Sequence, residues 1–268
     1  MNKFIIFDTE TTGLKVDTNQ IAQLSYAIIN SELEILKSKN FYFKVNNVEE
    51  GASAITGLTV DKLNILSGGK TFNDCSDEIF EDFNNANIIC HNTKFDFSFI
   101  EKEFERINKK LVIKSSFCTM LNYKDKLKLR HHYYGYKFPK LEEVVNFLKI
   151  DKEAINNVLS IISDDNNIDY HDARYDIACT YLAFKSIGEK YSDEGFNEFL
   201  KRNTQLEEQN NNFEYEKVEV KKIEVKNTND TSINRYTKNI ESSLAKKFKD
   251  DVRKSMQRFI ADSALSKN

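Results

Sequence analysis

The fold is decided by residues 4–13, which read Phe4-Ile5-Ile6-Phe7-Asp8-Thr9-Glu10-Thr11-Thr12-Gly13. A short apolar run that ends in an acid is typical of a buried strand. Because side chains alternate across a strand, Asp8 and Glu10 point to the same side. Two adjacent carboxylates repel each other unless a cation lies between them, and hard oxygen ligands of this kind favour Mg²⁺ or Mn²⁺. Taken alone, an Asp-x-Glu pair is more often a solvated acidic turn.

The segments that follow predict an α/β fold. Two further strands, residues 21–29 and 34–45, follow the first with short connections, which indicates an antiparallel meander. The pattern then alternates between strand and helix, which predicts a sheet with three antiparallel strands followed by parallel strands and flanked by helices. The later elements are a strand at 88–90 and helices at 71–83, 95–107, 141–148 and 173–187, the third of them begun by Pro139, the chain's only proline.

Two more acids follow later in the chain. Asp96 lies in the first turn of a predicted helix, where an acid is often only a partner of the helix dipole. Asp176 lies in the helix that begins at Ala173, with Asp172 as its expected N-cap. His171 then lies in the loop before that helix and can reach over Asp176. Taken alone, Asp96 and His171 each favour a structural interpretation.

Together the motifs resemble the DnaQ-like exonuclease superfamily, in the DEDD branch whose third motif carries a histidine (DEDDh). The match consists of Asp8-x-Glu10 with Thr-Thr-Gly after it, His91-Asn92-x-x-Phe95-Asp96, and His171-x-Ala173-x-x-Asp176. Within the superfamily it is similar to the proofreading domain of the DNA polymerase III epsilon subunit. The family's frequent His-Gly and Asp-Thr pairs are replaced here by Thr56-Gly57 and Cys118-Thr119, which affects local substrate contacts rather than metal ligands.

The resemblance implies an RNase H-like fold and a two-metal phosphodiesterase that works from the 3′ end and releases nucleoside 5′-monophosphates. Two Mg²⁺ or Mn²⁺ ions would be held by four acids, and His171 would act as general base. These acids are Asp8, Glu10, Asp96 and Asp176. Substrate contacts are expected from the backbone of Thr11, Thr12 and Gly13, from Leu14 against a base, and from Asn92 and Phe95.

Residues 124–140 combine six cations with interleaved aromatic and histidine side chains and a single acid, Asp125. Cations for phosphates and rings for bases are what proteins use to bind single strands. The alternative is a solvated helix face followed by a packing loop.

Composition argues against a membrane protein and against a zinc-binding protein. The chain has 268 residues, a net charge of −3 and no apolar run long enough to cross a bilayer, so no membrane association is expected. Its four cysteines are scattered and include no C-x-x-C pair, which indicates a reducing, cytoplasmic location rather than a zinc site. A mildly acidic charge does not exclude a nuclease, because a metal site adds carboxylates to the count.

Three regions are expected. Residues 1–190 form the exonuclease-like domain, 191–235 a charged linker or small extension, and 236–268 an amphipathic helix. That helix has apolar residues at i+4 spacing: Leu244, Phe248, Val252, Met256 and Ile260. It could dock on the domain, pair with another chain, or bind a DNA polymerase or other protein partner.

Single-stranded DNA 3′ ends are the expected substrate, in proofreading, repair or replication. RNA 3′-end trimming on the same fold is the alternative. An inactive nucleic-acid-binding or polymerase-partner module is a third reading, and the intact set of acids argues against it.

Overall fold

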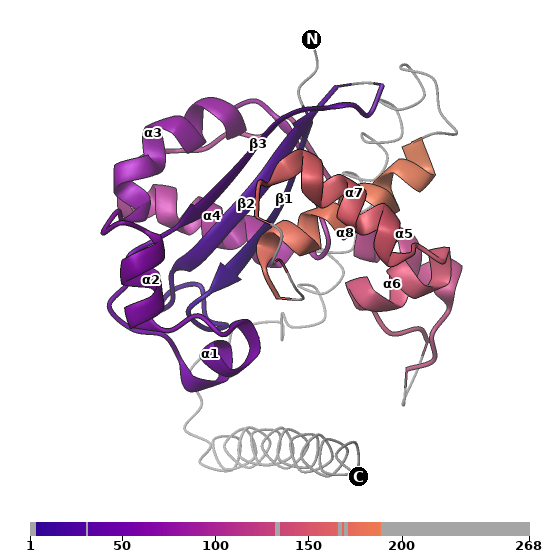
Figure 1. Ribbon diagram of the computed structural model, residues 1–268, viewed down its shortest axis with the longest axis horizontal. Coiled ribbons are helices and arrows are strands. Elements are labelled where there is room, and N and C mark those ends of the chain that lie inside the picture. The colour runs from indigo at the N-terminus through magenta and orange to yellow at the C-terminus, as the bar shows by residue number, and fades with distance from the viewer. Residues whose placement is uncertain (1–3, 31, 132–134, 166–167, 169–170, 189–268) are drawn as a thin grey trace, which may run out of the picture. The chain divides into compact units, whose positions relative to one another are not determined.

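The computed structural model describes residues 4–30, 32–131, 135–165, 168 and 171–188 (Figure 1). The linker or extension expected at 191–235 and the amphipathic helix expected at 236–268 lie outside these residues. No helix in the described part of the chain is long and apolar enough to span a membrane.

A five-stranded mixed sheet forms the centre of the fold, in the order β3-β2-β1-β4-β5. The first three strands pair antiparallel, and β4 and β5 continue the sheet in parallel from β1. The α/β, RNase H-like architecture expected from the sequence is therefore confirmed. The strands are β1 (Phe4–Thr11), β2 (Ile21–Ile29), β3 (Ile35–Tyr42), β4 (Asn87–Cys90) and β5 (Ser115–Cys118).

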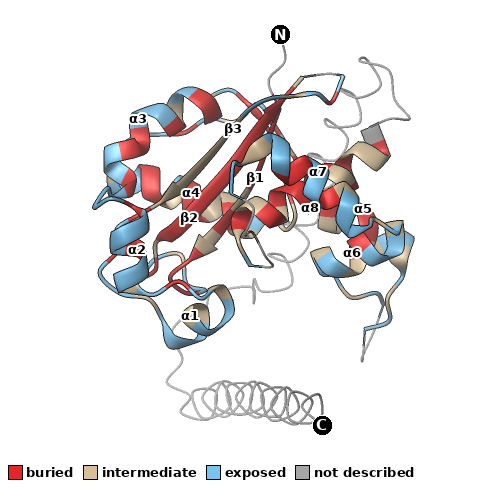
Figure 2. Cartoon of the chain, viewed as in Figure 1, coloured by how far each residue is buried: buried red, intermediate tan, exposed pale blue. Residues whose placement is uncertain are grey.

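Helices cover both faces of this sheet, so β1 has no solvated side. Phe4 and Ile6 belong to one apolar cluster and Ile5 and Phe7 to another, as expected for side chains that alternate across a strand. Figure 2 shows β1 and β2 largely buried, with β3 more exposed. The first cluster includes residues of α5 (Thr119–Leu127), α6 (Leu141–Leu148), α7 (Lys152–Ile162) and α8 (Ala173–Gly188), and the second includes residues of α3 (Phe72–Phe83) and α4 (Thr93–Arg106).

Several elements differ from the sequence prediction. β1 runs on to Thr11, because Asp8 and Glu10 still pair with Ser25 and Gln23 of β2. Both acids therefore lie inside the central strand rather than after it. Pro139 precedes the N-cap residue of α6, Lys140, and does not begin the helix. Strand β5 and four helices were not predicted: α1 (Glu50–Thr56), α2 (Val60–Leu66), α5 and α7.

Candidate active site

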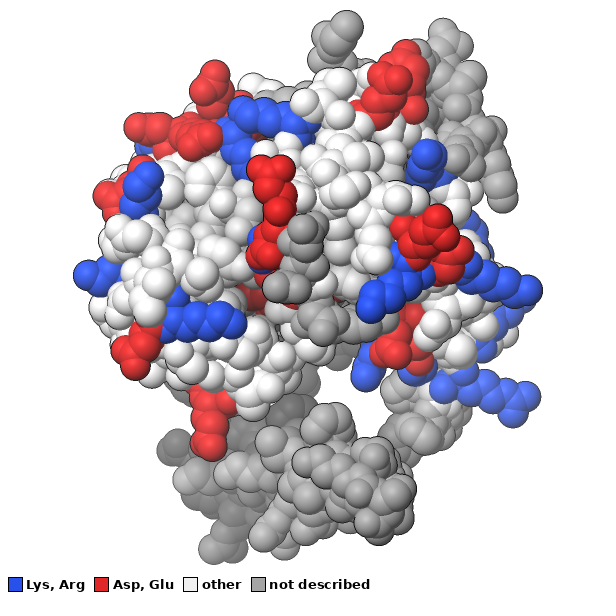
Figure 3. All heavy atoms as spheres, viewed as in Figure 1, with Lys and Arg blue, Asp and Glu red and all other residues white. Residues whose placement is uncertain are grey.

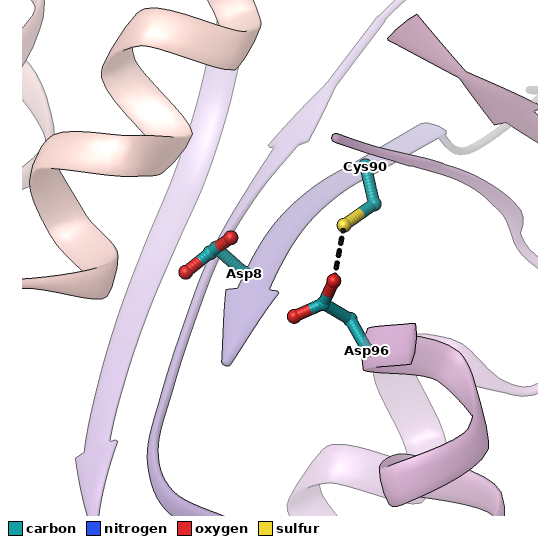
Figure 4. A group of neighbouring side chains, drawn as sticks. All are labelled: Asp8, Cys90 and Asp96. Atoms are coloured by element: carbon teal, nitrogen blue, oxygen red, sulfur yellow. Dashed lines mark hydrogen bonds between the residues drawn. The ribbon is translucent and has the colours of Figure 1, made fainter. Parts of the chain in front are cut away.

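Asp96 comes to the central strand from α4 and is fixed there by three hydrogen bonds. The backbone N–H and the hydroxyl of Thr9 donate to its Oδ1, at 3.1 and 2.7 Å. The Cys90 thiol donates to Oδ2 at 3.2 Å (Figure 4). Burial raises the pKa of Cys90 well above its ordinary value, with Asp96 adding to the effect, so the thiol keeps the proton that it donates. Asp96 is therefore held in one orientation beside Asp8.

Asp176 lies in the first turn of α8, and this turn is anchored to the sheet. The backbone carbonyl of Asp172 accepts the N–H of Asp176 at 3.2 Å, and its carboxylate accepts the N–H of Arg174 at 3.0 Å, which confirms Asp172 as the N-cap. Gln23, directly opposite Glu10 in the sheet, accepts the N–H of Ala173 at 3.2 Å. Its amide also donates to Asp172 at 2.9 Å. The buried side chain of Gln23 thus fixes the start of α8, and with it Asp176, relative to Asp8 and Glu10 of β1.

The other three acids, Glu10, Asp96 and Asp176, converge on Asp8. The ligand atoms of Asp8, Glu10 and Asp176 all lie within 4.8 Å of one another, and so do those of Asp8, Cys90 and Asp96. Asp8 belongs to both groups, which places it between two candidate cation positions. The sequence motifs predict that all four acids belong to one site, and the structure brings them together.

These carboxylates have no cationic partner among the described residues, because none of the ion pairs there involves them. Burial, together with repulsion from the other acids, raises the pKa of Asp8 well above its ordinary value and that of Glu10 to about 9. The same causes raise the pKa of Asp176 to about 7, and burial raises that of Asp96 to about 6. A cluster of buried oxygen ligands that lacks positive charge fits hard divalent cations.

A fifth acid nearby is compensated. Asp172 accepts hydrogen bonds from Nε and Nη2 of Arg174 at 2.9 and 2.7 Å. Nη1 of Arg174 also bonds Ser163 and Asp165, at 3.3 and 3.2 Å. Arg174 therefore connects the end of α7 to the start of α8, on either side of the loop that carries His171.

His171 lies in the turn before α8, as the sequence predicted. Its φ of 63° places it in the left-handed region, which histidine adopts more readily than most residues. The side chain is exposed and lines the same cavity as the four acids. The structure thus brings the candidate general base and the candidate metal ligands to one space.

That space is a cavity of about 560 Å³. Of the predicted substrate contacts, Asn92 and Phe95 line it. Phe138, Pro139 and Lys140, from the predicted single-strand-binding segment 124–140, also line it, and Met120, Leu141 and Tyr175 line it without having been predicted as contacts.

The predicted contacts at the end of β1 and in the loop after it, Thr11 to Leu14, are not among the described residues that line this cavity. The N–H of Thr12 donates to the carbonyl of Gln20 at 2.9 Å, so this donor is already used within the loop. Gly13 packs where a Cβ would come within 2.4 Å of Glu49. Leu14, by contrast, is 80% exposed, so its side chain is accessible to a ligand.

His91 is a residue for which the sequence suggested no role. Burial lowers its pKa to about 4, so the ring is neutral. Nε2 lies 3.0 Å from the carbonyl oxygen of Pro139 and Nδ1 lies 2.9 Å from the Thr119 hydroxyl. Since a carbonyl can only accept, Nε2 carries the proton. His91 therefore ties the end of β4 to the cavity wall that precedes α6.

The raised pKa values predict a measurable pH dependence of stability. In EDTA, the folded protein keeps protons on Glu10 and Asp176 that the unfolded chain releases near pH 4, so stability falls as pH rises from 6.5 to 9. His91 has a lowered pKa of about 4 in the folded protein and about 6.5 in the unfolded chain, so it opposes this trend, but only by about 0.4 kcal/mol and only up to about pH 7.5. One pKa unit is about 1.4 kcal/mol and 1 kcal/mol is about 2–4 °C. We therefore expect the melting temperature to fall by at least about 5 °C in a thermal-shift titration.

Divalent cations should reverse this trend, because metal replaces the protons that the acids lose. The increase in melting temperature on adding Mn²⁺ should be larger at pH 8.5 than at pH 6.5. A melting temperature in EDTA that stays constant or rises between pH 6.5 and 9 would show that the acids are ionised in the folded protein without metal.

Comparison with known proteins places this site in a family. A family model for exonucleases, of the RNase T type, matches residues 5–184. DNA polymerase III subunit epsilon of Buchnera aphidicola subsp. Schizaphis graminum is 34% identical over 130 residues, which cover 45% of this chain and 53% of that protein. The 3′-5′ exonuclease DinG of Staphylococcus epidermidis is 28% identical over 105 residues, 39% of this chain and 11% of that protein. The chain thus matches about half or less of the length of these relatives.

A solved structure with the same fold is E. coli Exonuclease I in complex with an oligonucleotide. The TM-score is 0.54 at 18% identity, over 69% of this chain and 41% of that one. At this identity the likeness supports the fold alone. The family model covers all the acids and His171, so the convergence on Asp8 lies inside the matched region.

Proposed function

Because this chain belongs to the RNase T family of exonucleases, we propose that it is a divalent-metal-dependent 3′→5′ exonuclease. It acts on DNA and releases nucleoside 5′-monophosphates. The observation that carries the proposal is the convergence on Asp8 of acids from β1, α4 and α8, with no cation paired to them among the described residues.

The residues present fit two cations. Asp8, Glu10 and Asp176 would hold one, and Asp8 with Asp96 would hold the other. Bound Mg²⁺ or Mn²⁺ supplies Lewis acidity to the phosphodiester and lowers the pKa of a coordinated water. The site is prepared for this charge by the hydrogen bonds that Thr9 and Cys90 donate to Asp96, which fix the direction of its carboxylate oxygens.

His171 takes the proton from the attacking water in this proposal. It lies in an exposed turn that lines the cavity, directly before α8, which carries Asp176. A general base must be neutral and within hydrogen-bond reach of the proton that it removes. Arg174 limits the movement of the turn by bonding Asp172 on one side and Asp165 on the other.

Terminal-nucleotide contacts follow from the cavity. Asn92 and Phe95 line it and are proposed to hold the last nucleotide, with Leu14 packed against its base. Thr11, Thr12 and Gly13 shape the loop that carries Leu14 and are proposed as secondary contacts. We propose DNA rather than RNA as the substrate, because a protein similar to this chain is a DNA polymerase III subunit.

The cellular location is proposed from the cysteines, and the protein partner is proposed from the sequence alone. All four cysteines are buried free thiols, which supports a reducing, cytoplasmic compartment. Proofreading, repair and replication are the processes proposed. A polymerase or other protein partner for residues 236–268 stays a prediction from the sequence.

An assay with labelled ends tests the activity and its direction. With Mg²⁺ and a 5′-labelled single-stranded DNA 20-mer, we expect a ladder that shortens one nucleotide at a time. The same oligonucleotide labelled at its 3′ nucleotide should release labelled mononucleotide at once, and EDTA should stop both reactions. RNA of the same sequence, run in parallel, measures the sugar preference. Early release of the 5′ nucleotide, or internal fragments, would contradict the proposed direction.

A further inference from the structure

Two short segments beside the cavity form a paired arm, here called the basic arm and defined as residues 128–131 and 135–138. The N–H of Lys137 donates to the carbonyl of Leu129 at 2.8 Å, and the N–H of His131 donates to that of Gly135 at 3.0 Å. Arg130 and Tyr136 form an antiparallel bridge between these bonds. The arm is therefore an ordered ladder that follows α5 and leads into Pro139.

The base of the arm is part of the cavity wall. Phe138, Pro139 and Lys140 all line the cavity that holds the four acids. His91 bonds the Pro139 carbonyl at 3.0 Å, which fixes this wall relative to β4. A ligand that lies along the arm can therefore extend directly into the cavity.

The arm and its surroundings carry cations without acidic partners. Lys137 pairs with Glu143, but Lys124, Lys128, Arg130 and Lys140 form no ion pair with any described residue. Lys128, Arg130 and Lys140 are exposed. Figure 3 shows Lys and Arg side chains projecting on the side of the molecule where α5 and α6 lie in Figure 1.

Aromatic rings are exposed among these cations. Phe138 is 43% exposed and Tyr136 is 41% exposed. The Lys124 ammonium lies 4.1 Å from the centre of the Phe138 ring. A ring and a cation side by side match a base and its phosphate, and this pairing is how proteins hold single strands without reading sequence.

We infer that the basic arm holds the single-stranded segment on the 5′ side of the nucleotide that is being removed. The acids take the terminal phosphodiester in the cavity, Phe138 and Lys140 meet the strand as it leaves, and Lys128, Arg130 and Tyr136 hold the next nucleotides. The inference rests on the proposed function for its substrate. It goes further by giving the strand a path and a set of residues outside the catalytic cavity.

The test separates strand binding from the chemistry. Lys128→Glu/Arg130→Glu changes two exposed residues that do not line the cavity, and Lys110→Glu/Lys152→Glu makes the same change in charge at exposed lysines elsewhere. Affinity for a fluorescent oligo(dT) 20-mer is measured by anisotropy, with Ca²⁺ in place of Mg²⁺. Hydrolysis of thymidine 5′-(4-nitrophenyl) phosphate, which has no strand to bind, is measured with Mn²⁺.

The arm variant should bind the oligonucleotide about tenfold or more weakly than wild type at moderate salt. The salt dependence of log K should lose a slope of about 1.4, since each single-strand phosphate contact contributes about 0.7. Tyr136→Ala, which changes no charge, should weaken binding about fivefold through lost stacking. Hydrolysis of the small ester should stay within about twofold for all these variants.

The inference is overturned if the arm variant binds as tightly as wild type with an unchanged salt slope. It is also overturned if the Lys110/Lys152 control weakens binding equally, or if ester hydrolysis falls with binding, because the arm would then act through net charge or through the active site. If the wild-type protein hydrolysed neither DNA nor the small ester, that result would instead count against the proposed function. The comparison of binding affinities would still report on the arm.

Discussion

Asp8→Asn is expected to reduce DNA cleavage at least about a thousandfold. Asp8 is the one acid that belongs to both groups of candidate ligands. Asparagine keeps the size of the side chain but removes the charge that both cations would need. Rates should be measured under single-turnover conditions with saturating enzyme, so that weak substrate binding is not mistaken for lost chemistry.

Stability should change in the opposite direction. The pKa of Asp8 is raised by burial and by repulsion from Asp96, Asp176 and Glu10, which means that its charge is unfavourable in the folded protein without metal. The melting temperature of Asp8→Asn in EDTA at pH 8 should therefore equal or exceed that of wild type, and added Mn²⁺ should raise it less. Asp61→Asn, the same chemical change at an exposed position of α2, should alter neither property. An Asp8→Asn protein with a tenth of the normal rate would remove Asp8 from the metal site.

His171→Ala should lower the rate about 10²–10⁴-fold, the usual contribution of a positioned general base. The loss should appear in the maximal rate rather than in substrate affinity, because His171 is proposed to act on the water. Affinity for Mn²⁺, measured by calorimetry, should be preserved, since the candidate metal ligands are the carboxylates.

A second variant separates chemistry from backbone strain. His171 has a φ of 63°, in the left-handed region, which alanine adopts less favourably than asparagine. His171→Asn keeps a side chain that tolerates this conformation but removes the base, so it should be as slow as His171→Ala and more stable. Near-normal activity in His171→Asn, or loss of Mn²⁺ affinity in either variant, would show that His171 is not the general base.

The elements that the sequence predicted well have a clear pattern of apolar residues. β2 and α6 agree with their predicted bounds, and α8 (Ala173–Gly188) begins at its predicted residue and ends one residue later. α1 was missed because none of its seven residues, all of them described, is buried, so it has no apolar stripe. β5 has only four residues, too few for a period. α7 is different: Ile155, Val158, Leu159 and Ile162 follow helical spacing after Asp151, and this signal was overlooked.

The site could be predicted only because its acids fall in three recognisable motifs. Periodicity alone places Asp8 and Glu10 together but gives no reason to bring Asp96 or Asp176 to them. The residues that position the acids carry no local signal. Gln23 reaches Asp172 across 149 positions of sequence, and His91 reaches the Pro139 carbonyl across 48. Such contacts depend on tertiary structure, and a pattern read along the chain does not contain them.

The order in which the acids occur along the chain has a consequence for synthesis. Asp8 and Glu10 leave the ribosome well before Asp176, which lies in α8, the last helix among the described residues. Ala173, Ile177 and Phe184 of that helix belong to the apolar cluster that contains Phe4 and Ile6. A nascent chain therefore has neither a covered central strand nor a complete set of acids until α8 has emerged. The same helix therefore completes both the covering of β1 and the candidate set of acids, so folding and assembly of the site are coupled during synthesis.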